Sequence, residues 1–222
     1  MWRSAVLAAA VGALVVTAVA AADPLDPKIR IRPADQAAAA AVILTQKDLG
    51  SGWAGGRITP NSLKMPRCPS LQPNFSDLTL TGHAESAFNN GNGGWQIDSD
   101  VTLLKSAKQV STQFARLLKP ALGTCVRYDV LKTTGTDPSI KLGVVKKLHF
   151  PKVGSVAVAY RTTIVVKVGK TSVTVYDDTL MLAKGRTSVW MNFVAPSQDE
   201  GPLELREQQL AKLLLGRVRS GA

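Results

Sequence analysis

The fold is decided by Ser155–Val194, SVAVAYRTTIVVKVGKTSVTVYDDTLMLAKGRTSVWMNFV. β-Branched and other apolar residues dominate this stretch, and Gly169-Lys170 and Lys184-Gly185 interrupt it with turn residues. It therefore predicts three strands, over 155–168, 171–183 and 187–194. Glycine at the first central position suits a two-residue type II′ turn at Gly169-Lys170. Because tight turns join antiparallel neighbours, an antiparallel sheet is expected here.

The turn at Gly169-Lys170 also predicts the register of the two strands that it joins. It places Arg161 opposite Asp178 and Ile164 opposite Val175. The charged pair would contribute roughly 0.2 to 1 kcal/mol as a cross-strand ion pair. The apolar residues change face along this hairpin, which leaves a β-bulge as the alternative.

The rest of the chain predicts further strands and helices. Strands are expected over 78–88, 95–104, 126–132 and 140–150, and helices over 34–44, 106–119 and from Pro202 onward. Ala54–Pro73 is interpreted as an ordered loop that carries Cys68, and Cys125 is expected just past a helix end. The predicted class is α+β, with a largely antiparallel single sheet, helices on one face and the order α-β-β-α-β(5)-α.

The N-terminus has the pattern of a secretory signal peptide. Arg3 precedes an uncharged apolar run, and small residues at cleavage positions precede Asp23. The predicted organisation is a signal peptide over 1–22, a leader over 23–32 and one domain over 33–222. The run is shorter than the roughly 20 residues of a membrane-spanning helix, and a retained N-terminal anchor is the alternative. We therefore expect a secreted, extracytoplasmic protein with no stable membrane span after cleavage.

The charge is strongly basic and unevenly distributed. The formal net charge is +11, and residues 101–186 hold 15 lysines and arginines against four acidic residues. Outside the cell, such a region favours anionic lipid headgroups, acidic glycans or anionic polymers as partners, or else is a solvated face. Export argues against nucleic acid. The oligomeric state is not predicted.

Cysteine and histidine usage predicts one disulfide and no metal site. The chain has two cysteines, Cys68 and Cys125, and an even count in an exported protein indicates a bond between them. A zinc site needs more ligands than this pair and the distant His83 and His149 provide. Each histidine lies in a predicted strand, and no cofactor is expected.

Paired carboxylates are the arrangement that comes nearest to catalysis, because glycosidases use two of them. Asp98 and Asp100 lie two apart in a predicted strand and hence on one face, whereas Asp177 and Asp178 are adjacent and hence on opposite faces. The predicted ion pair with Arg161 gives Asp178 a structural role. No catalytic residue is predicted.

Three tryptophans, Trp53, Trp95 and Trp190, are large enough to fill a core or to line a pocket. Trp190 lies in the last predicted strand, beside apolar residues on both faces of the sheet. We predict a groove beside Trp190 that holds a hydrophobic or amphipathic ligand, with nearby lysine or arginine contacting an anionic headgroup.

Three motifs carry a family resemblance. They are Leu44–Trp53 (LTQKDLGSGW), Pro66-Arg67-Cys68, and a helix over 114–125 that ends in Cys125. Together they resemble the PknH-like extracellular sensor domains and their secreted or lipoprotein relatives in actinobacteria. The resemblance implies an α+β domain with antiparallel strands and a cleft for an envelope ligand. A PsbP-like α/β/α sandwich is the related alternative fold. The kinase members have a second disulfide that this chain lacks, and no ligand residue is carried over.

Three classes of function remain open. The first is an exported, non-catalytic ligand-binding domain of the cell envelope, sensor-like, with a lipid, glycan or anionic polymer as ligand. The second is a basic structural or adhesive envelope protein. The third is a hydrolase.

Overall fold

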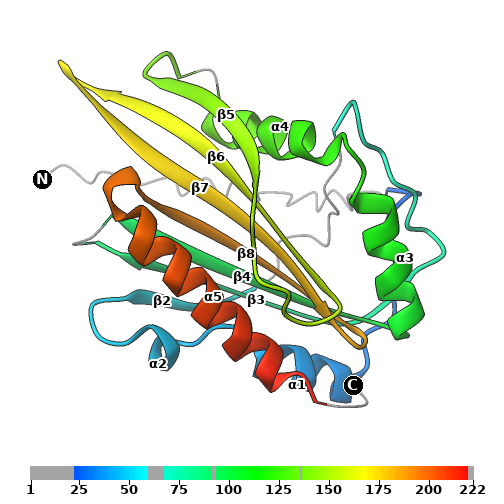
Figure 1. Ribbon diagram of the computed structural model, residues 1–222. Helices are drawn as coiled ribbons and strands as arrows, with labels where there is room; N and C mark the ends of the chain where they lie inside the picture. The colour runs from blue at the N-terminus through cyan, green and yellow to red at the C-terminus, as the bar shows by residue number, and fades with distance from the viewer. Residues whose placement is uncertain (1–22, 60–67, 92–93, 136, 220–222) are drawn as a thin grey trace, which may run out of the picture.

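A computed structural model describes residues 23–59, 68–91, 94–135 and 137–219 (Figure 1). The predicted signal peptide, 1–22, lies outside these residues and stays a prediction. Within the described part of the chain, no helix combines the length and the apolar character needed to cross a membrane.

One eight-stranded sheet organises the molecule. Its strands are β1 Lys28–Ile29, β2 Ala54–Ile58, β3 Thr79–Asn90, β4 Trp95–Leu104, β5 Ile140–Leu148, β6 Val156–Val168, β7 Thr171–Lys184 and β8 Thr187–Pro196. Their order is β1-β3-β4-β8-β7-β6-β5, and β2 pairs with β3 beyond the end of β1. Only the β1–β3 pair among these described strands is parallel, which confirms the predicted α+β class with a largely antiparallel single sheet.

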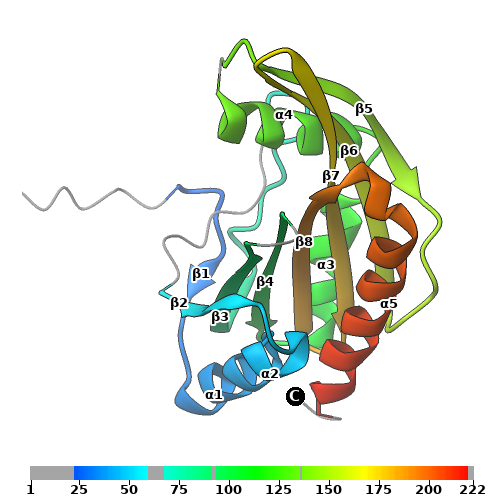
Figure 2. The same ribbon diagram turned by 90° about the vertical axis from the view of Figure 1, so that its left-hand side faces the viewer.

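The helices cover both faces of this sheet, where we expected one. They are α1 Pro33–Val42, α2 Gln46–Leu49, α3 Ala107–Leu117, α4 Leu122–Thr134 and α5 Glu200–Arg217, with a short 3-10 helix η1 over Ser197–Asp199. Successive strand residues point to opposite faces. Leu180 and Leu182 belong to a core with α1 and α5, and Met181 and Ala183 belong to a second core with α3 and α4. We call these the α5 face and the α4 face; α4 and α5 lie on opposite sides of β6 and β7 in Figure 2.

The β6–β7 hairpin has the predicted register. Arg161 pairs with Asp178, and pairing continues without a shift along the whole hairpin, so the alternative bulge does not occur. Gly169 has a φ of 62°, while no described non-glycine residue has a positive φ, in keeping with glycine as the first central residue of the turn.

Two predictions about local structure were wrong. The strand expected over 126–132 is part of α4, because Leu122, Val126 and Val130 recur every fourth residue and bury one helical face. Cys125 consequently lies inside this helix. Ala54–Ile58, expected in a loop, forms β2 on β3, where Gly55 has no side chain to collide with the carbonyl of Ala87.

The predicted disulfide is present. Cys68 and Cys125 are bonded, with their Cα atoms 5.3 Å apart. The bond ties the segment before β3 to α4 and lies within the core of the α4 face. The leader over 23–32 contributes β1, so part of it is fixed to the sheet.

Candidate functional site

The α4 face becomes polar over β3, β4, β8 and β7. Register shows this directly, because Glu85 pairs with Asp100, Asp100 with Trp190, and Trp190 with Met181 of the α4-face core. Alternation along these strands adds other polar residues to the same face. The face thus carries His83, Glu85, Asp98, Asp100, Thr102, Ser188, Trp190, Asn192, Asp177 and Thr162. We call Glu85, Asp98, Asp100 and Asp177 the acidic patch.

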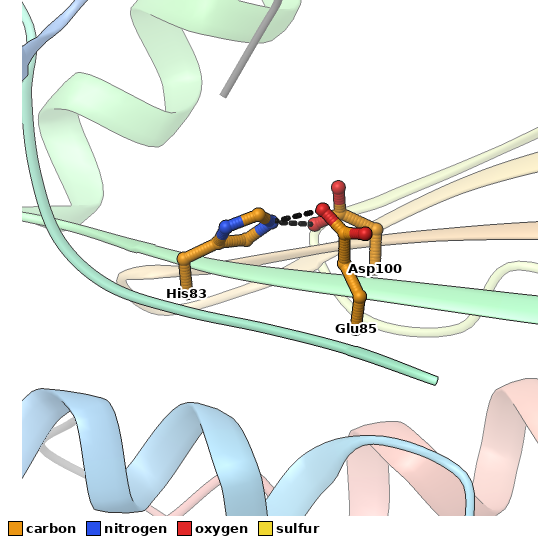
Figure 3. Close-up of side chains that lie close together, drawn as sticks. All are labelled: His83, Glu85 and Asp100. Carbon is orange, nitrogen blue, oxygen red and sulfur yellow. Dashed lines mark ion pairs between the residues drawn. The ribbon is translucent and has the colours of Figure 1, made fainter. Parts of the chain in front are cut away.

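His83 joins two members of the acidic patch (Figure 3). Its Nε2 lies 3.1 Å from Glu85 Oε1 and 3.1 Å from Asp100 Oδ1. The side chains of the three residues are 4%, 18% and 42% exposed, respectively. The ring is therefore buried, and the two carboxylates form the boundary between it and solvent.

A β-bulge aims His83 at this face. The β3–β4 register shifts between Leu80 and Gly82, so Leu80 and His83 share the α4 face although they are three residues apart. The side-chain amide of Gln36 then fixes the backbone, donating to the His83 carbonyl and accepting from its amide. This α1 residue occupies the edge of β3 between β1 and β2.

Close packing of α1 on β3 depends on Gly82. A Cβ there would lie 2.3 Å from the Asp35 carbonyl oxygen, too close for any side chain. Glycine at this position thus permits the approach that brings Gln36 to the backbone of His83.

Desolvation dominates the electrostatics of the acidic patch. Burial, and then the charge of Asp100, raise the pKa of Glu85, while burial alone raises the pKa of Asp98. Burial raises the pKa of Asp177 to about 6, against a hydrogen bond from Asn192 that lowers it. Among the described residues, no lysine or arginine forms an ion pair with any of these carboxylates. Within the described part of the chain, His83 is therefore the one basic side chain that pairs with members of the patch.

Buried polar atoms without a hydrogen-bond partner gather on this face. Those in the described strands that cross it are His83 Nε2, Asp100 Oδ1, Thr102 Oγ1, Thr162 Oγ1, Asp177 Oδ1 and Ser188 Oγ. Buried polar groups are normally paired in folded proteins, so each such atom calls for an explanation. Six such atoms of the described residues therefore lie on this one face of the sheet.

Trp190, the residue predicted to bind ligand, lies within this polar surface. It is partly buried and packs against the core of the α4 face. Its partner on β4 is the carboxylate of Asp100, so the charge placed beside it is negative. The other two tryptophans serve the fold: Trp53 is in the core of the α5 face, and Trp95 donates to Asp199.

A separate ionic cluster lies beneath α5. Arg161 is fully buried, donates to Asp178 at 2.7 to 3.0 Å, and pairs with Glu200. Its guanidinium also stacks 4.3 Å above the ring of Tyr176. Burial and the neighbouring Asp178 raise the pKa of Glu207 to about 10, so this carboxyl is neutral at pH 7. The cluster ties the start of α5 to the sheet.

A hollow of about 320 Å³ lies between α1 and the end of α5, away from the acidic patch. Alanines of α1 line one side of it, and Arg217 and Val218 line the other. Arg217 is already paired with Asp48, so this hollow offers mainly small apolar side chains.

Sequence reasoning identified two parts of this site and missed its centre. It predicted that Asp98 and Asp100 share one face of the sheet and that Asp177 and Asp178 point to opposite faces. It did not connect His83 to Asp100. The alternation over 83–88 and 95–100, on either side of the asparagine- and glycine-rich sequence 89–94, was the signal that could have paired these strands.

No family model matches the chain, and no curated protein matches it. Among solved structures, the chain is similar to the crystal structure of the extracellular domain of PknH from Mycobacterium tuberculosis. The TM-score is 0.44 at 12% identity, and the match covers 84% of this chain and 97% of that chain. This neighbour belongs to the family that the sequence motifs resemble.

Proposed function

We propose that the protein is an extracytoplasmic, non-catalytic binding domain whose acidic patch and Trp190 take a hydroxyl-rich envelope glycan. The observation that carries the proposal is the polar face on which the carboxylates of Glu85, Asp98 and Asp100 are partly or fully exposed beside Trp190. Their oxygens are hydrogen-bond acceptors, which suit the hydroxyl groups of a sugar. A partly exposed aromatic ring beside them offers an apolar surface for the C–H face of the same sugar.

The charge of the site favours a neutral glycan over an anionic polymer. Glu85, Asp98 and Asp100 would repel phosphate or carboxylate groups, and the described residues give them no lysine or arginine partner. The basic residues of 101–186 would then act in solubility or in general attraction to the envelope. An adhesive protein would instead hold anionic polymer through exposed charges and release it at high salt.

Isothermal titration calorimetry against purified neutral and anionic envelope glycans tests this proposal. We expect binding of a neutral glycan that changes little with salt and that falls about tenfold or more in Asp98→Asn, because losing a charged acceptor costs about 1.5 to 3 kcal/mol. Asp137→Asn is the matched control. It removes the same charge at an exposed turn, where the asparagine oxygen can still accept from Ser139.

The same titrations separate the competing functions. Binding of anionic polymer alone, lost at high salt, would replace the proposal with the adhesive one. Release of shortened glycan during the titration would instead identify a hydrolase, and Asp98→Asn would then abolish that release.

A further inference from the structure

We propose that His83, Glu85 and Asp100 bind a divalent transition-metal ion, with Zn²⁺ as the probe. One imidazole nitrogen and two carboxylate oxygens supply the ligands. This proposal does not depend on a glycan binding to the same face.

The ligand atoms already have the separations that a metal site requires. One ligand atom from each residue can be chosen so that all lie within 4.8 Å of one another, and Nε2 is 3.1 Å from an oxygen of each carboxylate. Tetrahedral ligands about 2.0 to 2.1 Å from zinc are separated by about 3.3 Å. An ion between the three side chains would therefore need only small side-chain adjustments.

The ring nitrogen supplies the independent observation. A charged imidazole held by two carboxylates is the competing interpretation, and it requires an N–H directed at an oxygen. His83 Nε2 is buried and has no hydrogen-bond partner, although both oxygens are close. The dashed lines in Figure 3 mark ion pairs from this nitrogen to both carboxylates, yet no N–H is directed at either oxygen well enough to form a hydrogen bond, so a metal ion can take the position between the three ligand atoms.

The neighbouring residues fix the positions of these ligands, and none of the described lysines or arginines pairs with the two carboxylates. The Gln36 amide fixes the His83 backbone on both sides, and the β3–β4 pair fixes Glu85 opposite Asp100. Two carboxylates side by side repel each other unless a cation lies between them. A divalent ion would supply that cation where the described part of the chain provides no lysine or arginine.

The ligand set narrows the choice of metal. Calcium and magnesium take oxygen ligands, whereas imidazole with carboxylate suits zinc and its transition-metal neighbours. Three protein ligands leave at least one position open, as in zinc sites that also hold water or substrate.

Titration of the full chain, disulfide formed and metal removed with EDTA, tests the site. We expect one Zn²⁺ per chain by calorimetry. His83→Gln and Asp100→Asn should each weaken binding about tenfold or more, as even second-shell changes do. His149→Gln is the matched control, because His149 is the other histidine and is exposed.

Nitrogen-15 spectra of the histidine rings give a second measurement on the unmodified chain. Zn²⁺ should shift the His83 ring nitrogens at one equivalent and leave those of His149 unchanged. The proposal is overturned if His149→Gln removes binding, if Ca²⁺ binds while Zn²⁺ does not, or if Zn²⁺ leaves the His83 ring unchanged. Should His83→Gln fail to fold, Asp100→Asn and the spectra decide the question.

Discussion

Replacing Arg161 with leucine should destabilise the protein strongly, because it leaves Asp178 buried without a cation. Both side chains are 0% exposed, and three hydrogen bonds of 2.7 to 3.0 Å join them. Breaking a buried pair by removing one partner typically costs about 3 to 5 kcal/mol. We expect a loss in this range, since Arg161 also contacts Glu200 and the ring of Tyr176.

An exposed pair in the same chain gives the matched control. Arg116 and Asp77 form a two-pronged ion pair, but their side chains are 33% and 59% exposed. Exposed pairs contribute about 0 to 1 kcal/mol, so Arg116→Leu should cost at most about 1 kcal/mol. The two substitutions change the same atoms and differ mainly in burial.

Urea unfolding at pH 7, followed by tryptophan fluorescence with the disulfide intact, measures both losses. The double variant Arg161→Leu with Asp178→Leu should recover much of the stability, because it removes the unpaired charge together with its partner. The reasoning is refuted if Arg161→Leu costs no more than Arg116→Leu, or if the double variant is as unstable as Arg161→Leu alone.

Three further predictions concern the same fold. In the folded protein the pKa of Glu207 is raised from 4.5 to about 10. The stability that the Glu207 carboxyl contributes is therefore fully present below pH 4.5 and is lost as the pH rises toward 10. Glu207→Gln should consequently be more stable than wild type at pH 9, as measured by urea unfolding. Replacing Cys68 and Cys125 with serine should cost about 4 kcal/mol, as should reduction of the wild type, because the bond closes a loop of 57 positions. Gly82→Ala should cost about 1 to 3 kcal/mol by thermal unfolding, whereas Gly56→Ala, where a Cβ meets nothing within 4 Å, should cost little.

Local chemistry made the β6–β7 hairpin predictable. Gly169 takes the positive φ that the tight turn needs, and the turn then determines each pair along the hairpin, including Arg161 with Asp178. The disulfide was predictable for a different reason. Expected export favours disulfide formation, and a chain with two cysteines allows one pairing. Neither prediction required knowledge of distant packing.

The elements that failed depend on tertiary contacts. Val126 and Val130 fit a short strand as well as a helix, and in the structure both are buried on one helical face with Leu122. The His83 cluster needs the bulge after Leu80, the amide of Gln36 and the β3–β4 register together. Cysteine and histidine alone were weighed as metal ligands from the sequence, whereas strand pairing brings the carboxylates of Glu85 and Asp100 to His83.

Adjacent residues Asp177 and Asp178 show how the sheet separates stability from binding. Asp178 faces α5 and is paired with Arg161, so its charge is compensated inside the protein. Asp177 faces the other way, has a pKa raised to about 6 by burial, and has a buried oxygen without a hydrogen-bond partner. The fold thus pairs Asp178 with a buried cation, whereas Asp177 receives only the hydrogen bond from Asn192 and lies on the face with His83, Glu85 and Asp100. A cation or a further hydrogen-bond donor at that face would lower the electrostatic cost of Asp177, which supports our proposal that this face binds.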